Sequence, residues 1–339
     1  MTIDRSHHVS RIDDESGVGE ARRAAVAMAE RAGFNQVDSG KVAIAVTEAA
    51  ANVLKHGRGG QILLRSIPSG LEMLAIDSGP GIADLHAALA DGRSTAGTAG
   101  IGFGAISRLA SSLEVYTRHE AGTVLAAQFQ SSGGEPRSSP APALELGVAL
   151  APYPGEHLCG DAWAIESNRL FLADGLGHGI QACEAATAAV NAFRQHLDQP
   201  VATAVEAIHR ALRPTRGAAV ALAELDAAAH TVRFCGLGNI GASIVEGVQP
   251  HGMMSHNGTA GHEVHRISQF DYPWPENALV VLHTDGISAR WDLAAYPGLA
   301  LRHPALVAAV LYRDFRRLRD DAAVLVAGVR ARLAREGIA

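Results

Sequence analysis

The sequence LADGLGHG at residues 172–179 decides the fold of the larger part of this chain, together with three shorter stretches. These are LCGD at residues 158–161, HTDG at 283–286 and RDD at 319–321. Carboxylates therefore occur at four separated points, and two of the aspartates precede glycine at the end of an apolar, strand-like run. Hard divalent cations prefer oxygen ligands, and two of them about 3.5–4 Å apart need carboxylates from several strands. The pattern predicts a two-metal site.

The order of these motifs resembles the metal-dependent type-2C (PPM) serine/threonine phosphatases, and within them the small bacterial SpoIIE/RsbX-like branch. The resemblance implies that Asp174 bridges two Mn²⁺ or Mg²⁺ ions and that the carbonyl of Gly175 completes one site. It also implies that Asp161, in the Gly-Asp pair, holds the first ion, partly through water.

By the same resemblance, Asp285 and Asp320 hold the second ion. Asp320 is favoured over its neighbour Asp321 because the first acidic residue of this motif is normally the ligand. The chemistry implied is direct in-line attack of an activated water on phosphorus, without a covalent phospho-enzyme.

Composition limits the other possibilities. The chain has 339 residues, 47% hydrophobic and 19% charged, which suits two domains with cores of their own. Its net charge of −6 and the lack of a basic run argue against nucleic acid and anionic membranes as partners. The three cysteines lack metal-ligand or disulfide spacing, and the N-terminus lacks an apolar signal core, so we expect a cytoplasmic protein.

A segment rich in Ser, Gly and Pro divides the chain. Residues 130–143 read QSSGGEPRSSPAPA, without periodicity. We therefore expect a first domain over residues 1–130, a linker over 131–143 and a second domain over 144–335.

The first domain is expected to be an α/β sandwich, with a mixed sheet covered on one face. Helices are predicted at 18–32 and 38–56, the second with Asp38 or Ser39 as its N-cap and Gly57 as its end. A further helix is expected after Gly104. Strands are predicted at 61–67, 71–76, 113–118 and 122–129.

The second domain is expected to be an α-β-β-α sandwich, with two sheets inside and helices outside. Helices are predicted at 178–197, 200–212 and 304–317. Strands are predicted at 144–150, 160–166, 169–173, 217–225, 230–236, 240–245, 278–284 and 322–329. The Gly-rich residues 236–241 are interpreted as a tight β-turn, and the polar residues 255–262 as a candidate flap.

Three motifs in the first domain favour nucleotide binding. Glu48 and Asn52 are four residues apart and so share a helix face. DSGPG at residues 77–81 follows an apolar strand, and TAGIGFG at 98–104 precedes a helix. A carboxylate can accept the adenine amino hydrogen, an amide oxygen can bind Mg²⁺, and glycines let backbone N–H groups approach phosphates.

This order resembles the GHKL ATPase/histidine-kinase-like superfamily, and the stretch DGRSTAG at residues 91–97 resembles RsbT-like switch serine kinases. The resemblance implies ATP with Mg²⁺ as cofactor, Glu48 as catalytic base and Asn52 as magnesium ligand. The residues implied for the adenine pocket are Asp77, Gly79 and Gly81, and those for the phosphate lid are Gly100, Gly102 and Gly104. Thr98 stands where such kinases tend to carry glycine, which restricts the backbone of that lid.

Together the two resemblances imply a bifunctional partner-switching regulator. It would dephosphorylate, and also phosphorylate, a STAS-domain antagonist protein in bacterial stress or sigma-factor signalling. Homodimerisation is an open possibility. In one alternative, the first domain binds ATP and a partner without transferring phosphate and controls the phosphatase. In another, both sites are vestigial and the chain is a scaffold.

Overall fold

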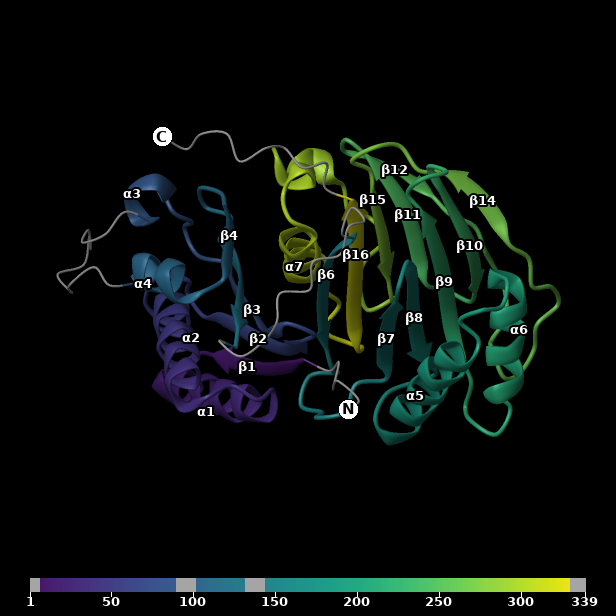
Figure 1. Cartoon of the computed structure of the whole chain (residues 1–339), viewed down its shortest axis with the longest axis horizontal. Coiled ribbons are helices and arrows are strands. Elements are labelled where there is room, and N and C mark those ends of the chain that lie inside the picture. Colours follow the sequence, from purple (N-terminus) through teal and green to yellow (C-terminus); the bar gives the residue numbers. More distant parts are fainter. Residues whose placement is uncertain (1–6, 90–101, 132–143, 330–339) are drawn as a thin grey trace. The chain divides into compact units, whose positions relative to one another are not determined.

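The computed structural model describes residues 7–89, 102–131 and 144–329 (Figure 1). The chain divides into two compact units, with the boundary between Ser138 and Ser139. The linker expected at 131–143 lies outside the described residues except for its first residue. Each unit is described by itself.

The first unit is built on a five-stranded sheet in the order β1-β2-β3-β5-β4. Every neighbouring pair is antiparallel, so the expectation of a mixed sheet was wrong. The reason is that β5 lies between β3 and β4, so β4, which runs in the same direction as β3, does not pair with it. Strand β1, which the sequence analysis missed, pairs antiparallel with β2 at the edge. The strands are β1 (His8–Ile12), β2 (Gly60–Ile67), β3 (Gly70–Asp77), β4 (Ser112–Thr117) and β5 (Thr123–Gln130).

Helices pack on one face of this sheet through a core of alanine, valine and leucine side chains. They are α1 (Glu15–Arg31), α2 (Gln36–His56), α3 (Leu85–Leu89) and α4 (Gly102–Leu109). The N-cap of α2 is Asn35, whose side chain accepts from the N–H of Asp38 at 2.8 Å, so the expected Asp38 or Ser39 cap was wrong. The predicted end of α2 at Gly57 is confirmed.

The second unit contains two sheets. One has the order β13-β10-β9-β8-β7, with β14 also paired to β10, and the other has the order β12-β11-β15-β16-β6. The first consists of β7 (Asp161–Glu166), β8 (Arg169–Gly175), β9 (Ala218–Asp226), β10 (Thr231–Leu237), β13 (Ser255–His256) and β14 (Phe270–Pro273). The second consists of β6 (Leu144–Ala151), β11 (Gly241–Glu246), β12 (Gln249–Gly252), β15 (Leu279–His283) and β16 (Ala322–Val329).

Apolar side chains from both sheets form one core, and helices close the two outer faces (Figure 1). Helices α5 (Ile180–Gln195) and α6 (Val201–Ala211) cover the β7–β10 sheet, and α7 (Pro304–Phe315) covers β6 and β16. Two short 3₁₀ turns, Leu293–Ala295 and Leu299–Leu301, precede α7. The predicted α-β-β-α layering is confirmed.

Two Gly-containing segments adjoin the end of β10. Residues 238–240 carry the chain from β10 in one sheet to β11 in the other. Residues 255–262 begin with β13, which lies parallel to β10. Among the described residues, no helix is long and apolar enough to cross a membrane.

Candidate active sites

Asp161 and Asp174 are brought together by the β7–β8 hairpin. They are register partners, because Asp161 begins β7 and Asp174 stands next to the end of β8. The pairing is extended past Asp161, where the N–H of Gly175 donates to the carbonyl of Gly160 at 3.0 Å. Directly opposite residues of an antiparallel pair have Cβ atoms about 4.5–5.5 Å apart. The hairpin therefore holds two carboxylates side by side.

The second sheet contributes Thr284 and Asp285 just past the end of β15. The hydroxyl of Thr284 donates to Oδ2 of Asp161 at 2.7 Å and accepts from the N–H of Ala323 at 3.0 Å. This buried hydroxyl links the two sheets at the carboxylates. Oδ2 of Asp285 accepts from the side-chain amide of Asn239 at 2.6 Å, so the inter-sheet connection orients this aspartate.

Asp320 and Asp321 precede β16 and have different surroundings. Asp321 is 2% exposed, and its Oδ1 accepts from the N–H of Tyr153 at 2.8 Å. Burial raises the pKa of Asp321, and hydrogen bonds from the backbone of Tyr153 and Gly160 and from the Cys159 thiol oppose this. Oδ1 of Asp320 accepts from the N–H of Asp321 at 2.9 Å. Asp320 is partly exposed and is therefore the more accessible of the two carboxylates. Asp321 is buried and is fixed by the backbone N–H of Tyr153.

Mutual repulsion among these carboxylates is visible in their pKa values. Burial, followed by the charges of Asp285, Asp320 and Asp321, raises the pKa of Asp174 to about 8. Burial and then the charge of Asp174 raise the pKa of Asp161 well above its usual range, although its hydrogen bond from Thr284 opposes this. Burial also raises the pKa values of Asp285 and Asp320.

These residues suit hard cations that retain water. No three His, Cys, Asp or Glu side chains of the described ranges converge to enclose one ion. Mg²⁺ needs no such cage, because it keeps several waters and is usually bound by one or two carboxylates. The raised pKa values show a concentration of negative charge that a cation would relieve. The donor set therefore fits Mg²⁺ or Mn²⁺.

Two glycines at these motifs lie directly against neighbouring main chain. A Cβ added at Gly175 would lie 2.2 Å from the carbonyl oxygen of Ala182, in the first turn of α5. One added at Gly286 would lie 1.8 Å from the carbonyl oxygen of Asp321. The Asp-Gly pairs thus let the carboxylate-bearing segments pack closely on α5 and on the start of β16.

His178 lies beside this site. Its Nδ1 is 2.5 Å from Oε1 of Glu156, and its ring stacks on Tyr153 with centroids 4.6 Å apart. The His178 charge also lowers the pKa of Asp320, against the larger effect of burial, which places the imidazole near that carboxylate.

In the first unit, α2 presents Glu48 and Asn52 on one face, both partly buried. The Nδ2 of Asn52 is buried and has no hydrogen-bond partner among the described residues. A Cβ added at Gly102, the first residue of α4, would lie 3.2 Å from this nitrogen. Asn52 thus lies next to the N-terminal turn of α4, where free N–H groups favour anions.

Asp77 ends β3 in a fixed orientation. Its Oδ1 accepts from the N–H of Gly79 at 2.8 Å and from the N–H of Thr123 at 3.1 Å. A Cβ added at Gly79 would lie 2.4 Å from the carbonyl oxygen of His56, and Gly81 has a φ of +76°. The glycines therefore allow the turn that packs Asp77 against the end of α2.

The remaining lid residues divide between two parts of the chain. Gly102 and Gly104 lie inside α4, so this helix begins three residues earlier than expected. Gly100, Thr98 and the stretch 91–97 lie outside the described residues.

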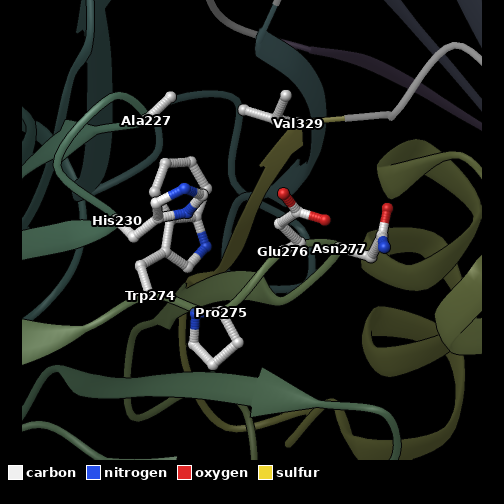
Figure 2. A pocket seen from close by; sticks show the side chains of 7 residues that line it. All are labelled: Ala227, His230, Trp274, Pro275, Glu276, Asn277 and Val329. Atoms are coloured by element: carbon white, nitrogen blue, oxygen red, sulfur yellow. The ribbon is translucent and has the colours of Figure 1, made fainter.

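A separate apolar cavity of about 240 Å³ lies in the second unit (Figure 2). Trp274, His230 and Val329 are among the residues that line it. Val329 ends β16, whereas Asp320 and Asp321 precede its first residue, so the strand of eight residues separates the cavity from the carboxylates. Trp274 itself is buried and donates from Nε1 to the carbonyl of Ala278 at 2.9 Å, which indicates a packing role.

Sequence reasoning missed Asn239 and Thr284 as supporting residues. Thr284 directly precedes Asp285 in HTDG, so its position in the motif was a usable signal. Asn239 had no such signal, because only the fold brings β11 beside β15 and thereby Asn239 next to Asp285.

Comparisons with known proteins agree with this architecture. The histidine kinase-like ATPase domain family matches residues 13–129. The stage II sporulation protein E (SpoIIE) family matches residues 166–330. The serine/threonine-protein kinase RsbT of Bacillus subtilis (strain 168) is 34% identical over 103 residues, which cover 29% of this chain and 77% of RsbT.

Two solved structures are also similar to this chain. One, described as part of the bacterial stressosome, a modular system adapted to control secondary messenger signaling, is 28% identical with a TM-score of 0.51. The match covers 55% of this chain and 99% of that chain. The other, RsbX in complex with magnesium, is 16% identical with a TM-score of 0.46, covering 55% of this chain and 96% of that chain.

Proposed function

We propose that this chain is a bifunctional partner-switching regulator. Its first unit belongs to the RsbT-like family of histidine kinase-like ATPase domains, and its second unit is a SpoIIE-type PPM phosphatase domain. In this proposal, the second unit hydrolyses phosphoserine or phosphothreonine on a STAS-domain antagonist protein. The first unit transfers phosphate from ATP to the same protein.

The observation that carries the phosphatase half is that aspartates from both sheets lie within electrostatic reach of one another. Asp161 and Asp174 come from one sheet, and Asp285 and Asp320 adjoin strands of the other. Their charges raise one another's pKa values, so they lie within electrostatic reach. A concentration of carboxylates with this pattern favours a pair of Mn²⁺ or Mg²⁺ ions.

The proposed roles follow from these positions. Asp174 lies among the other carboxylates and would contact both ions, with the carbonyl of Gly175 beside it. Asp161 would hold the first ion, while Asp285 and Asp320 would hold the second. When bound, the ions supply Lewis acidity toward the phosphoryl group. Thr284 and Asn239 keep Asp161 and Asp285 oriented and favour their ionised forms.

The kinase half is supported by Asn52 and Asp77. The unpaired Nδ2 of Asn52 is an amide end beside the N-terminus of α4, where the phosphates of Mg-ATP would lie. The ordered carboxylate of Asp77 would accept the adenine amino hydrogen beside Gly79 and Gly81. Glu48, one turn before Asn52, would act as the general base toward the partner's hydroxyl.

An intact-mass experiment tests both halves. Protein carrying Asp285→Asn is incubated with Mg-ATP and a STAS-domain candidate encoded nearby, so that transferred phosphate is retained. We expect a mass gain of one phosphate on the candidate, lost when Glu48→Gln is added, and removed by wild-type protein with Mn²⁺. Exposed Asp198→Asn and Glu30→Gln are the matched controls for the two substitutions.

The outcomes separate the candidate functions. No mass gain, with ATP binding intact, would make the first unit a nucleotide-dependent partner-binding module that controls the phosphatase. Retention of the phosphate after addition of wild-type protein and Mn²⁺ would contradict the phosphatase assignment.

A further inference from the structure

Cationic side chains gather in the last turn of helix α6 and just after it. Residues 208–217 read IHRALRPTRG, with three arginines and no acidic residue, in a chain of net charge −6. Arg210, Arg213 and Arg216 are all exposed. Together with His209 and His262 they form what we call the arginine patch.

Hydrogen bonds hold the patch together from two segments of the chain. His209 Nδ1 accepts from the N–H of Gly261 at 3.1 Å. His262 Nε2 lies 2.8 Å from the carbonyl oxygen of Arg216 and donates to it. Ala218 and Ala260 exchange two backbone hydrogen bonds at 3.1 and 2.9 Å. The patch is therefore a fixed part of the sandwich.

The patch adjoins the carboxylate site directly. Ala218 and Ala219, just after Arg216, are the register partners of Gly175 and Asp174. The N–H of Leu176 donates to the carbonyl of Gly217 at 3.1 Å, and the Arg216 guanidinium donates to the carbonyl of Leu176 at 3.5 Å. Arg216 thus lies against the loop that follows Asp174, and Arg210 and Arg213 precede it in the same exposed segment.

The cations of the patch affect one another. The pKa of His209 is lowered, first by partial burial and then by the charges of Arg213, Arg210 and His262. The positive charge of the patch comes from its three arginines, which occur within residues 210–216. Exposed charges of one sign attract partners of the opposite sign and guide their approach.

Apolar side chains are exposed on the segments that carry the carboxylates. Leu176 is 44% exposed, Leu158 is 45% exposed and Ile180 is 65% exposed. A surface that combines exposed apolar residues with arginines is typical of contacts with another protein.

We propose that the arginine patch docks an acidic segment of the phosphoprotein substrate, next to the phosphorylated residue. This inference rests on the proposed phosphatase function and adds the substrate's chemistry to it. Carboxylates that flank the phosphoserine pair with Arg213 and Arg216 in bidentate fashion, which positions the phosphate over the aspartates. Substrates with neutral or basic flanks lose these contacts.

Fluorescence anisotropy with labelled phosphoserine peptides tests the patch. The peptides carry Asp/Glu, Ala or Lys flanks and are titrated with the full chain in EDTA, so that binding is measured without hydrolysis. We expect the acidic peptide to bind at least about fivefold more tightly than the alanine peptide, since each exposed pair adds a modest increment. The Arg213→Glu and Arg216→Glu variants should bind the acidic and the alanine peptides with about equal affinity.

The matched control is Arg302→Glu, an exposed arginine before α7, which should keep the preference. Equal binding of the three peptides by wild type, or an undiminished preference in both patch variants, would overturn the docking proposal. Hydrolysis of the same peptides after addition of Mn²⁺ is read separately. Binding preference without hydrolysis would contradict the phosphatase function while leaving the patch established.

Discussion

Asp161 and Asp174 face each other directly across the antiparallel strands β7 and β8. Like charges in this arrangement destabilise a sheet. Their neighbours in the site are further carboxylates, which raise the pKa of both residues in addition to burial. The fold thus keeps negative charge concentrated until a cation or protons neutralise it.

This arrangement predicts an unusual pH dependence for the metal-free protein. The folded-state pKa of Asp174 is raised from 3.8 to about 8. Between these values the folded state binds more protons than the unfolded state, so stability falls as pH rises. In EDTA, we expect the Tm to fall between pH 6 and pH 8, and added Mn²⁺ to restore it most at pH 8.

The control for this prediction is Asp174→Asn, which removes the charge at nearly constant shape. In EDTA at pH 8 it should be more stable than wild type, and Mn²⁺ should stabilise it less. A wild-type Tm in EDTA that rises over this pH range would contradict the assigned direction of the pKa shift. Differential scanning calorimetry measures both proteins.

Thr284→Val should weaken both the fold and metal binding. The valine leaves the buried N–H of Ala323 without its acceptor and removes the donor to Asp161. Unpaired buried groups cost about 1–3 kcal/mol, so urea unfolding should show a loss of that order. Thr284→Ser keeps the hydroxyl and should retain Mn²⁺ affinity; equal Mn²⁺ titrations for the Val and Ser variants would exclude this role.

Asn239→Ala should affect the metal site without a large loss of stability. Asn239 is exposed, and its hydrogen bond lowers the pKa of Asp285 against the larger effect of burial. Without it, Asp285 competes less well for cations at low pH. Isothermal titration calorimetry should show a larger loss of Mn²⁺ affinity at pH 6 than at pH 8. Asn191→Ala on α5 is the control, and a loss independent of pH would argue for a different cause.

Asp77→Asn should weaken ATP binding. The carboxylate is fixed by the N–H groups of Gly79 and Thr123, and an amide can present an N–H donor where an acceptor is needed. Loss of a charge-assisted hydrogen bond of about 1.5–3 kcal/mol corresponds to a decrease in affinity of about tenfold or more. Calorimetry with Mg-ATP measures it, with Asp198→Asn as control; unchanged affinity would remove Asp77 from the nucleotide pocket.

Two glycines of the first unit should respond in opposite ways to alanine. Gly40 lies inside α2, and a Cβ added there would meet open space, so Gly40→Ala should stabilise by about 0.5–1 kcal/mol. Gly81 has a φ of +76°, and a Cβ there would lie 2.1 Å from the carbonyl oxygen of Arg118. Gly81→Ala should destabilise by about 2 kcal/mol or more. Urea unfolding compares them, and a stabilising Gly81→Ala would refute the strained geometry.

Long periodic segments were predictable from sequence because the spacing of their apolar residues matches the pattern of buried positions. The predicted strand at 322–329 coincides with β16, and the predicted helix at 38–56 ends with α2. The short strands β13 and β14 were not predictable, because they owe their existence to pairing with β10 rather than to apolar alternation. The N-cap choice failed for a local reason, since Asn35 offered an equally good acceptor three residues earlier.

The candidate site was also predictable only in part from the sequence. Its aspartates could be named from their motifs, but their proximity depends on the register of β7 with β8 and on the facing of two sheets. Asn239 shows the limit most clearly. It contacts Asp285 across 46 positions of sequence, and no local pattern encodes that contact.

The close packing at Gly175 and Gly286 has a consequence for how this protein can vary. Neither glycine contributes a side chain to the site, yet any substitution would force apart main-chain segments that carry the carboxylates. In a library of all single variants, these two positions should therefore tolerate as little change as the aspartates before them. Excess Mn²⁺ could compensate for a weakened ligand, but it could not make room for a methyl group. The paths by which such a protein diversifies are thus limited by space as well as by chemistry.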